Sequence, residues 1–179
     1  MFPTQLKISL KISIVVLLSS FLAGKDINDT KLQVDLIYTI CGFIAADLVS
    51  QKLQKQINQI DQKVGKKIAA DIVGPCVMLL TKALLARNPI NKKYLFKILC
   101  VIIGFTCYNV FIADRLNNSK IDDDVKEMIG NVFKPSVMLM VSGYLENGKN
   151  PFKSQVIRNA LFTANGFMAN TLVVKATGI

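Results

Sequence analysis

The sequence has 179 residues, is 51% hydrophobic, has a mean hydropathy of +0.40 and carries a formal charge of +10. It holds no histidine, so the commonest general base and metal ligand is absent. No glycine-rich phosphate loop appears either, and we therefore predict no enzymatic activity, no catalytic residue, no cofactor and no metal site. Its lysines lie mostly between apolar stretches, which is typical of lipid headgroup anchors and makes nucleic acid the less favoured partner.

The first apolar stretch runs from Ile12 to Ala23 and follows Lys7 and Lys11, a layout shared with signal peptides. The residues at its end fit a cleavage site poorly, so we expect the stretch to be retained. It would be either a short membrane span or an interfacial anchor. We predict an N-terminal hydrophobic extension over residues 1–30 and a polytopic helical membrane domain over residues 31–179.

A second apolar segment, which ends at Gln51, carries small residues at helical spacing. Gly42, Ala46 and Ser50 recur every fourth position, a pattern that lets another helix approach closely within lipid. Asp47 lies beside this stripe, and Gln51 follows it by one helical turn. We expect Asp47 to face protein, because a carboxylate that faces lipid is costly.

A third apolar segment covers residues 68–86 and holds Gly74 and Pro75 near its start. Proline lacks an N–H and fits the first helical turn, so a kink or a late helix start is expected there. Lys82, near the other end, has a stem long enough to reach the headgroups. Asn91 is a candidate cap for the next helix.

The longest uncharged run, Ile98–Ala113, is the central candidate for a membrane span. At a rise of about 1.5 Å per residue, its sixteen residues cover most of a hydrocarbon core of ~30 Å. Asn109 is the polar residue that we single out within it. The acidic loop that follows, around Asp122 and Asp124, suits the positive end of a helix better than a calcium loop.

Two further apolar segments complete the chain, at residues 128–145 with Pro135 in the middle, and at residues 156–174. The last segment carries Asn159, Asn165 and Asn170, which are polar for a lipid-facing helix and favour packing inside a bundle. The fold class predicted is all-α, a multi-pass transmembrane bundle of four to six hydrophobic helices with short polar loops. A soluble all-helical domain is the alternative, because charges interrupt several runs.

Short sequence patterns recur about 60 residues apart. Pro75-Cys-Val-Met-Leu79 returns as Pro135-Ser-Val-Met-Leu139, and Gly-Phe pairs begin at Gly42, Gly104 and Gly166. A polar residue follows five positions after each of these glycines, namely Asp47, Asn109 and Thr171. Chance recurrence within a small apolar alphabet is the favoured explanation, and a duplicated helical hairpin is the alternative.

Four of these stretches also occur together in a known family. They are Ala46-Asp47-Leu48-Val49-Ser50-Gln51-Lys52-Leu53, Val73-Gly74-Pro75, Pro135-Ser-Val-Met-Leu139 and Asn165. Over about residues 32–175 the chain resembles the 22-kilodalton peroxisomal membrane protein family, which includes mitochondrial inner-membrane members. The resemblance implies a pore-like or homeostatic protein of an organelle membrane, either peroxisomal or mitochondrial inner.

Two functional hypotheses follow for this non-enzymatic chain. In the first, Asp47 faces a pore; a purely structural alternative for Asp47 is hydrogen bonding to Gln51, Asn109 or Asn165. In the second, the protein is a membrane anchor or accessory subunit of a large assembly, such as a respiratory complex or the internal membrane layer of a virus. The expected partners are the lipid bilayer and either other subunits or further copies of this chain.

Overall fold

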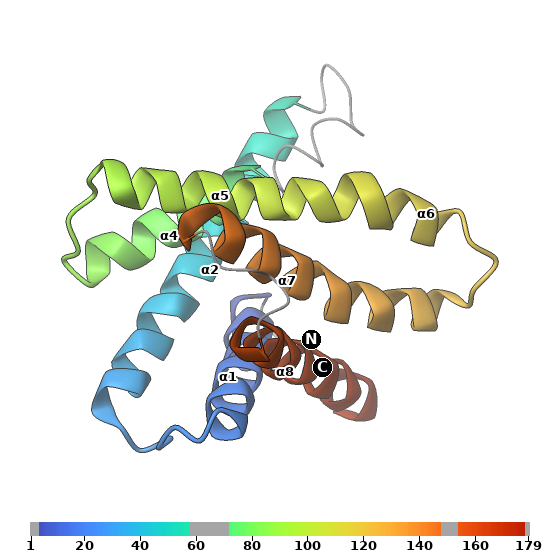
Figure 1. Cartoon of the computed structure of the whole chain (residues 1–179), viewed down its shortest axis with the longest axis horizontal. Helices are drawn as coiled ribbons and strands as arrows, with labels where there is room; N and C mark the ends of the chain where they lie inside the picture. The colour runs from blue at the N-terminus through green and yellow to red at the C-terminus, as the bar shows by residue number, and fades with distance from the viewer. Residues whose placement is uncertain (1–3, 58–71, 148–153, 178–179) are drawn as a thin grey trace.

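A computed structural model describes residues 4–57, 72–147 and 154–177, and all of its regular structure is helical (Figure 1). The helices are, in chain order, α1 (Thr4–Leu22), α2 (Thr30–Ile57), α4 (Gly74–Leu85), α5 (Lys92–Tyr108), the π-helical turn η2 (Asn109–Ala113), α6 (Asp114–Asn117), α7 (Asp123–Asn147) and α8 (Ser154–Thr177). The predicted all-α fold is therefore confirmed, and the described ranges contain no strand.

Local chemistry marks the starts of three of these helices. Pro75 lies in the first turn of α4, but Ile72 and Val73 before it are π-helical, so the structure shows a change of helix type at this point and not the late helix start that was one of the two expectations. The side-chain oxygen of Asn91 accepts the backbone N–H of Tyr94 at 3.0 Å, which caps α5. At the start of α7, a carboxylate oxygen of Asp122 accepts the N–H of Asp124 at 2.9 Å. The starts of α5 and α7 agree with the cap at Asn91 and the acidic helix start predicted from the sequence.

The helices pack in a circle that follows the order of the chain. Four pairs form the main contacts within it: α2 with α4, α5 with α7, α7 with α8, and α1 with α8. The pairs are joined where α1 packs on α2 and α4 on α5. In Figure 1, α5 and α7 run side by side as one long arm, and α8 lies along α1. The first and last described helices are thus neighbours.

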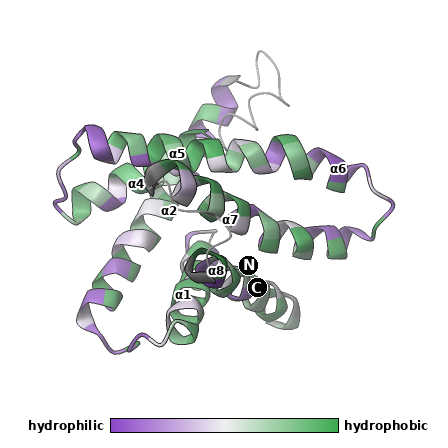
Figure 2. Cartoon of the chain, in the orientation of Figure 1, coloured by the Kyte–Doolittle hydropathy of each residue, from purple (hydrophilic) through white to green (hydrophobic). Residues whose placement is uncertain are grey.

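Three helical stretches are long and apolar enough to cross a membrane: Thr4–Leu22, Thr30–Gln56 and Lys92–Asn117. Helix α4 is also apolar but shorter, and the start of the apolar segment that contains it lies outside the described residues. Polar residues gather in the connections that follow α1, α4 and α6 (Figure 2). The fold is compatible with membrane insertion, and α1 has the length and composition of a span.

Helix α7 continues through a proline. Pro135 is buried, and its missing N–H leaves the carbonyl of Asn131 without its usual partner within the helix. One residue further on, the hydroxyl of Ser136 donates to the carbonyl of Val132 at 2.7 Å. The interruption is therefore local, and α7 remains one element that packs against both α5 and α8.

Candidate functional site

The small residues of α2 form a close contact with α4. Gly42 is buried, and a Cβ atom added to it would lie 2.6 Å from the carbonyl oxygen of Met78. Ala46, one turn further on, is 6% exposed, and Ser50 is half-buried. The prediction that this stripe admits another helix is confirmed, and α4 is that helix.

Asp47 lies next to this stripe and is half-buried. Its Oδ2 accepts a hydrogen bond from Nε2 of Gln51 at 2.8 Å, within the same helix. The two side chains therefore lie on one side of α2, as their spacing predicted. Of the three partners considered for Asp47, Gln51 is the one found; Asn109 lies in η2, and Asn165 is exposed on α8.

The asparagines of α8 divide between its two faces. Asn159 and Asn165 are exposed, which differs from the inward orientation expected from the sequence. Asn165 precedes Gly166, the residue that contacts α1, and successive residues are turned by about 100° around a helix. Asn170 is 4% exposed, and its side-chain oxygen has no hydrogen-bond partner in the structure. Within residues 4–57, 72–147 and 154–177, it is the buried side-chain oxygen left without a partner.

One polar contact links α7 to α8. The Nδ2 atom of Asn131 donates to the hydroxyl oxygen of Thr171 at 2.9 Å, and Thr171 is 3% exposed. The same hydroxyl donates to the carbonyl of Phe167, one turn earlier in α8, at 3.1 Å. Thr171 is one of the three polar residues that lie five positions after the glycines of the Gly-Phe pairs. This member of the recurring set therefore lies at a helix interface.

An ion pair links α2 to α4. Nζ of Lys82 lies 2.8 Å from Oδ1 and 2.9 Å from Oδ2 of Asp35. The side chain of Lys82 is 29% exposed and that of Asp35 is 54% exposed. The sequence predicted that Lys82 reaches toward headgroups; instead, antiparallel packing brings a carboxylate from the first half of α2 within its reach.

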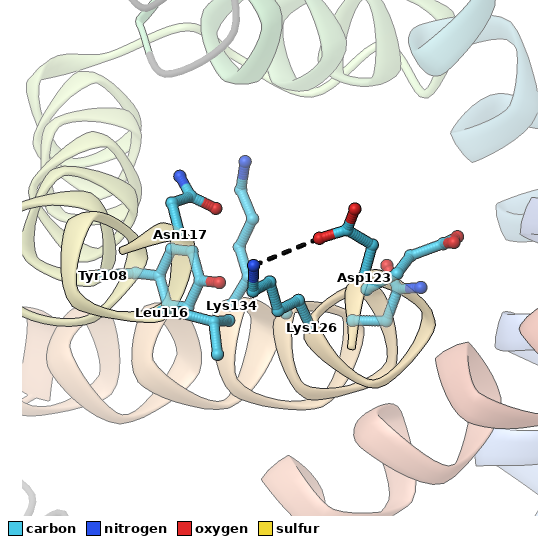
Figure 3. Close-up of a pocket in the computed structure, with 9 residues that line it drawn as sticks. Tyr108, Leu116, Asn117, Asp123, Lys126 and Lys134 are labelled. Carbon is cyan, nitrogen blue, oxygen red and sulfur yellow. Dashed lines mark hydrogen bonds and ion pairs between the residues drawn. The ribbon is translucent and has the colours of Figure 1, made fainter. Parts of the chain in front are cut away.

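A shallow cavity of about 440 Å³, open to solvent where its lining residue Asp123 is 98% exposed, lies between the end of the α5–α6 arm and the first half of α7 (Figure 3). Tyr108, 5% exposed, lines it, and Nζ of Lys126 pairs with Asp123 at 3.1 Å. The side chain of Lys134 also lines the cavity, and its Nζ lies 5.3 Å from the centre of the Phe105 ring. The other polar residues that line it are Asn117, Glu127 and Asn131.

The cavity combines two ammonium groups, two carboxylates, two amides and a phenol. Such a lining binds small polar molecules through hydrogen bonds and paired charges. It contains no nucleophile held by a base. Sequence reasoning missed the cavity because its residues come from two segments that only the folded chain brings together. The one available indication was that Asn131 and Lys134 interrupt an apolar segment.

The described residues contain no group of three His, Cys, Asp or Glu side chains able to hold a metal ion, and Cys41, Cys76, Cys100 and Cys107 form no disulfide. Comparison with family models, curated proteins and solved structures gives no match to this chain. The structure therefore defines a class, an all-helical bundle with membrane-type helices. The resemblance to the 22-kilodalton peroxisomal membrane protein family stays a prediction.

Proposed function

We propose that this chain is a non-enzymatic integral membrane protein that forms a pore-like bundle for small polar solutes. By resemblance, its membrane is that of an organelle, peroxisomal or mitochondrial inner. The observation that carries the proposal is the polar cavity beside Tyr108. It lies next to the interface at which Asn131 meets Thr171.

Polar groups inside an otherwise apolar bundle support this proposal. A buried amide or hydroxyl costs free energy in lipid unless it is paired, so such groups mark cavities and pathways. The orphaned oxygen of Asn170 is adjacent in the chain to Thr171, and water is the usual partner of such an atom. A hydrated interior would satisfy Asn170 and connect with the cavity that Asn131 lines.

Solute flux into liposomes tests the proposal. The purified protein is reconstituted, and swelling is followed after addition of small neutral and charged solutes. We expect flux well above that of protein-free vesicles, reduced several-fold by Asn131→Leu combined with Tyr108→Phe. Lys93→Gln, at an exposed position at the start of α5, is the matched control and should leave flux unchanged. Flux equal to that of empty vesicles would remove the pore role.

Asp47 has a separate test. Asp47→Asn keeps the size of the side chain and a hydrogen-bonding partner for Gln51, so the fold should stay intact. Unchanged flux in this variant would show that Asp47 serves helix structure and not the pathway.

A second function, that of a structural anchor or accessory subunit in a respiratory or viral membrane assembly, is favoured by the Asp47 contact. The carboxylate is held by Gln51 of its own helix, so it does not have to face a solute path. Purification in mild detergent separates the two functions. Recovery only as part of a complex with other subunits supports the anchor, whereas an isolated oligomer that conducts solutes supports the pore.

A further inference from the structure

The recurring Gly-Phe pairs mark three equivalent helix contacts. A Cβ atom added to Gly42 would lie 2.6 Å from the carbonyl oxygen of Met78, and one added to Gly104 would lie 2.8 Å from that of Met138. Met78 and Met138 are the matching methionines of the two Pro-x-Val-Met-Leu runs. Two hairpins, α2 with α4 and α5 with α7, therefore pack with the same residues in contact.

The third Gly-Phe pair makes the same contact with α1. A Cβ atom added to Gly166 of α8 would lie 2.7 Å from the carbonyl oxygen of Val15. Nζ of Lys11, four residues before Val15, lies 5.8 Å from the centre of the Phe167 ring. In the second hairpin, Lys134 stands four residues before Met138 and covers Phe105 in the same way, at 5.3 Å.

Two independent contacts thus place α1 in the role that α4 and α7 play in the hairpins. Helix α8 and helix α1 are a third copy of the same unit, divided between the two ends of the chain. Gly166 contacts Val15, and Phe167, the next residue of α8, contacts Lys11, which comes before Val15 in α1. The pair is therefore antiparallel, as are the two hairpins.

This equivalence extends to the outer surface. The six residues that meet at these contacts are Gly42, Met78, Gly104, Met138, Gly166 and Val15. The residue six positions after each of them in the sequence is apolar or aromatic and at least half exposed. These six outward residues are Phe21, Leu48, Leu84, Val110, Tyr144 and Leu172. The residue after each of them is also exposed and apolar. The same outward face is repeated around the whole circle of helices.

Several polar residues of α7 and α8 lie at the interfaces between helices, whereas Asn165, seven residues before Leu172 and therefore on the same side of α8, is exposed. Asn131 donates to Thr171, Lys134 lies over Phe105, and Asn170 is buried. These side chains lower the hydropathy of α7 and α8, which are not among the three helices apolar enough to qualify as spans by composition.

We infer that all six helical segments cross the bilayer, as three copies of one hairpin, and that lipid acyl chains occupy the six outward faces. The inference rests on the proposed membrane function and extends it from three candidate spans to six. Lipid is favoured over a protein partner because the face is repeated on every helix, and a partner on one side would need only one or two of them. Each outward residue lies about 9 Å along the helix from its contact, so contacts placed at the bilayer centre would keep all six within a half-thickness of ~15 Å.

Spin labels on the outward residues test the inference. The four cysteines are first replaced by alanine, and single cysteines are then introduced at the six positions and labelled in liposomes. Collisions with oxygen report lipid, and collisions with a water-soluble nickel complex report water. We expect all six labels to be oxygen-accessible and shielded from nickel, whereas a label at the exposed loop residue Asn28 should be nickel-accessible.

The other outcomes separate the two proposals. Nickel access at Leu84, Tyr144 and Leu172 with oxygen access at the other three positions overturns the six crossings but leaves a membrane protein. Shielding from both reagents at those three positions overturns lipid as the occupant and indicates a protein partner. Nickel access at all six removes the membrane function itself.

A second measurement does not depend on labelled variants. Six crossings place Thr4 and Thr177 on the same side of the bilayer. Short tags fused at the two chain ends should therefore be digested together by protease added outside sealed vesicles, or be protected together. Digestion of only one tag would refute an even number of crossings.

Discussion

Substitution of the contact glycines by alanine gives the most direct test of the packing. A Cβ atom at Gly104 would lie 2.8 Å from backbone atoms of Met138, and ordinary van der Waals contact begins near 3.4 Å. Helices α5 and α7 must therefore separate by about 0.6 Å, because backbone cannot rotate away as a side chain can. Such overpacking costs about 1–3 kcal/mol, of which the better helix propensity of alanine returns up to about 1 kcal/mol. We expect a net loss of about 1–2 kcal/mol.

Gly143 in α7 is the matched control, because a Cβ atom there would meet nothing within 4 Å. Gly143→Ala should stabilise the protein by about 0.5–1 kcal/mol through helix propensity alone. Unfolding free energies are measured in mixed micelles by titration with a denaturing detergent, with helicity as the readout. Gly42→Ala and Gly166→Ala should behave like Gly104→Ala. A Gly104→Ala protein as stable as Gly143→Ala would show that α5 and α7 do not approach as described.

Three further predictions concern polar contacts between and at the ends of the helices. Asn131→Leu and Thr171→Val should each destabilise the bundle, and a double-mutant cycle should give a coupling of about 0.6 kcal/mol, typical of such bonds in membranes; zero coupling would contradict the contact. Lys82→Gln should lower the free energy of unfolding by about 0.2–1 kcal/mol because its partner Asp35 is half exposed. A larger loss in the same titration would mean that the ion pair is more shielded from water than described. Asn91→Ala should cost about 1 kcal/mol and speed amide exchange at the start of α5, whereas unchanged exchange would argue against the cap.

Local features of the sequence predicted local features of the fold. The stripe at Gly42 and Ala46 predicted a close helix contact, and Asn91 predicted a cap. Each of these depends on a residue's own backbone preferences or on spacing within one helix. Asp47 and Gln51 were likewise correctly placed on one side of α2 because the α-helical repeat fixes their relation.

Features that depend on which helices meet were harder to predict. The pair of Lys82 with Asp35 joins residues 47 positions apart, and hydropathy does not say which apolar faces adjoin. The contact of Gly166 with Val15 was hidden because α1 has neither the proline nor the methionine of the other two copies. The cavity was missed for the same reason, since Tyr108 and Lys126 belong to different segments.

The pairing of α1 with α8 bears on how the protein is made. A ribosome delivers the chain from its first residue, so α1 is made long before α8 exists. During that interval the surface of α1 around Val15 lacks its native cover, and Lys11 lacks the Phe167 ring. Assembly of this circle of helices can therefore be completed only after synthesis of the final helix.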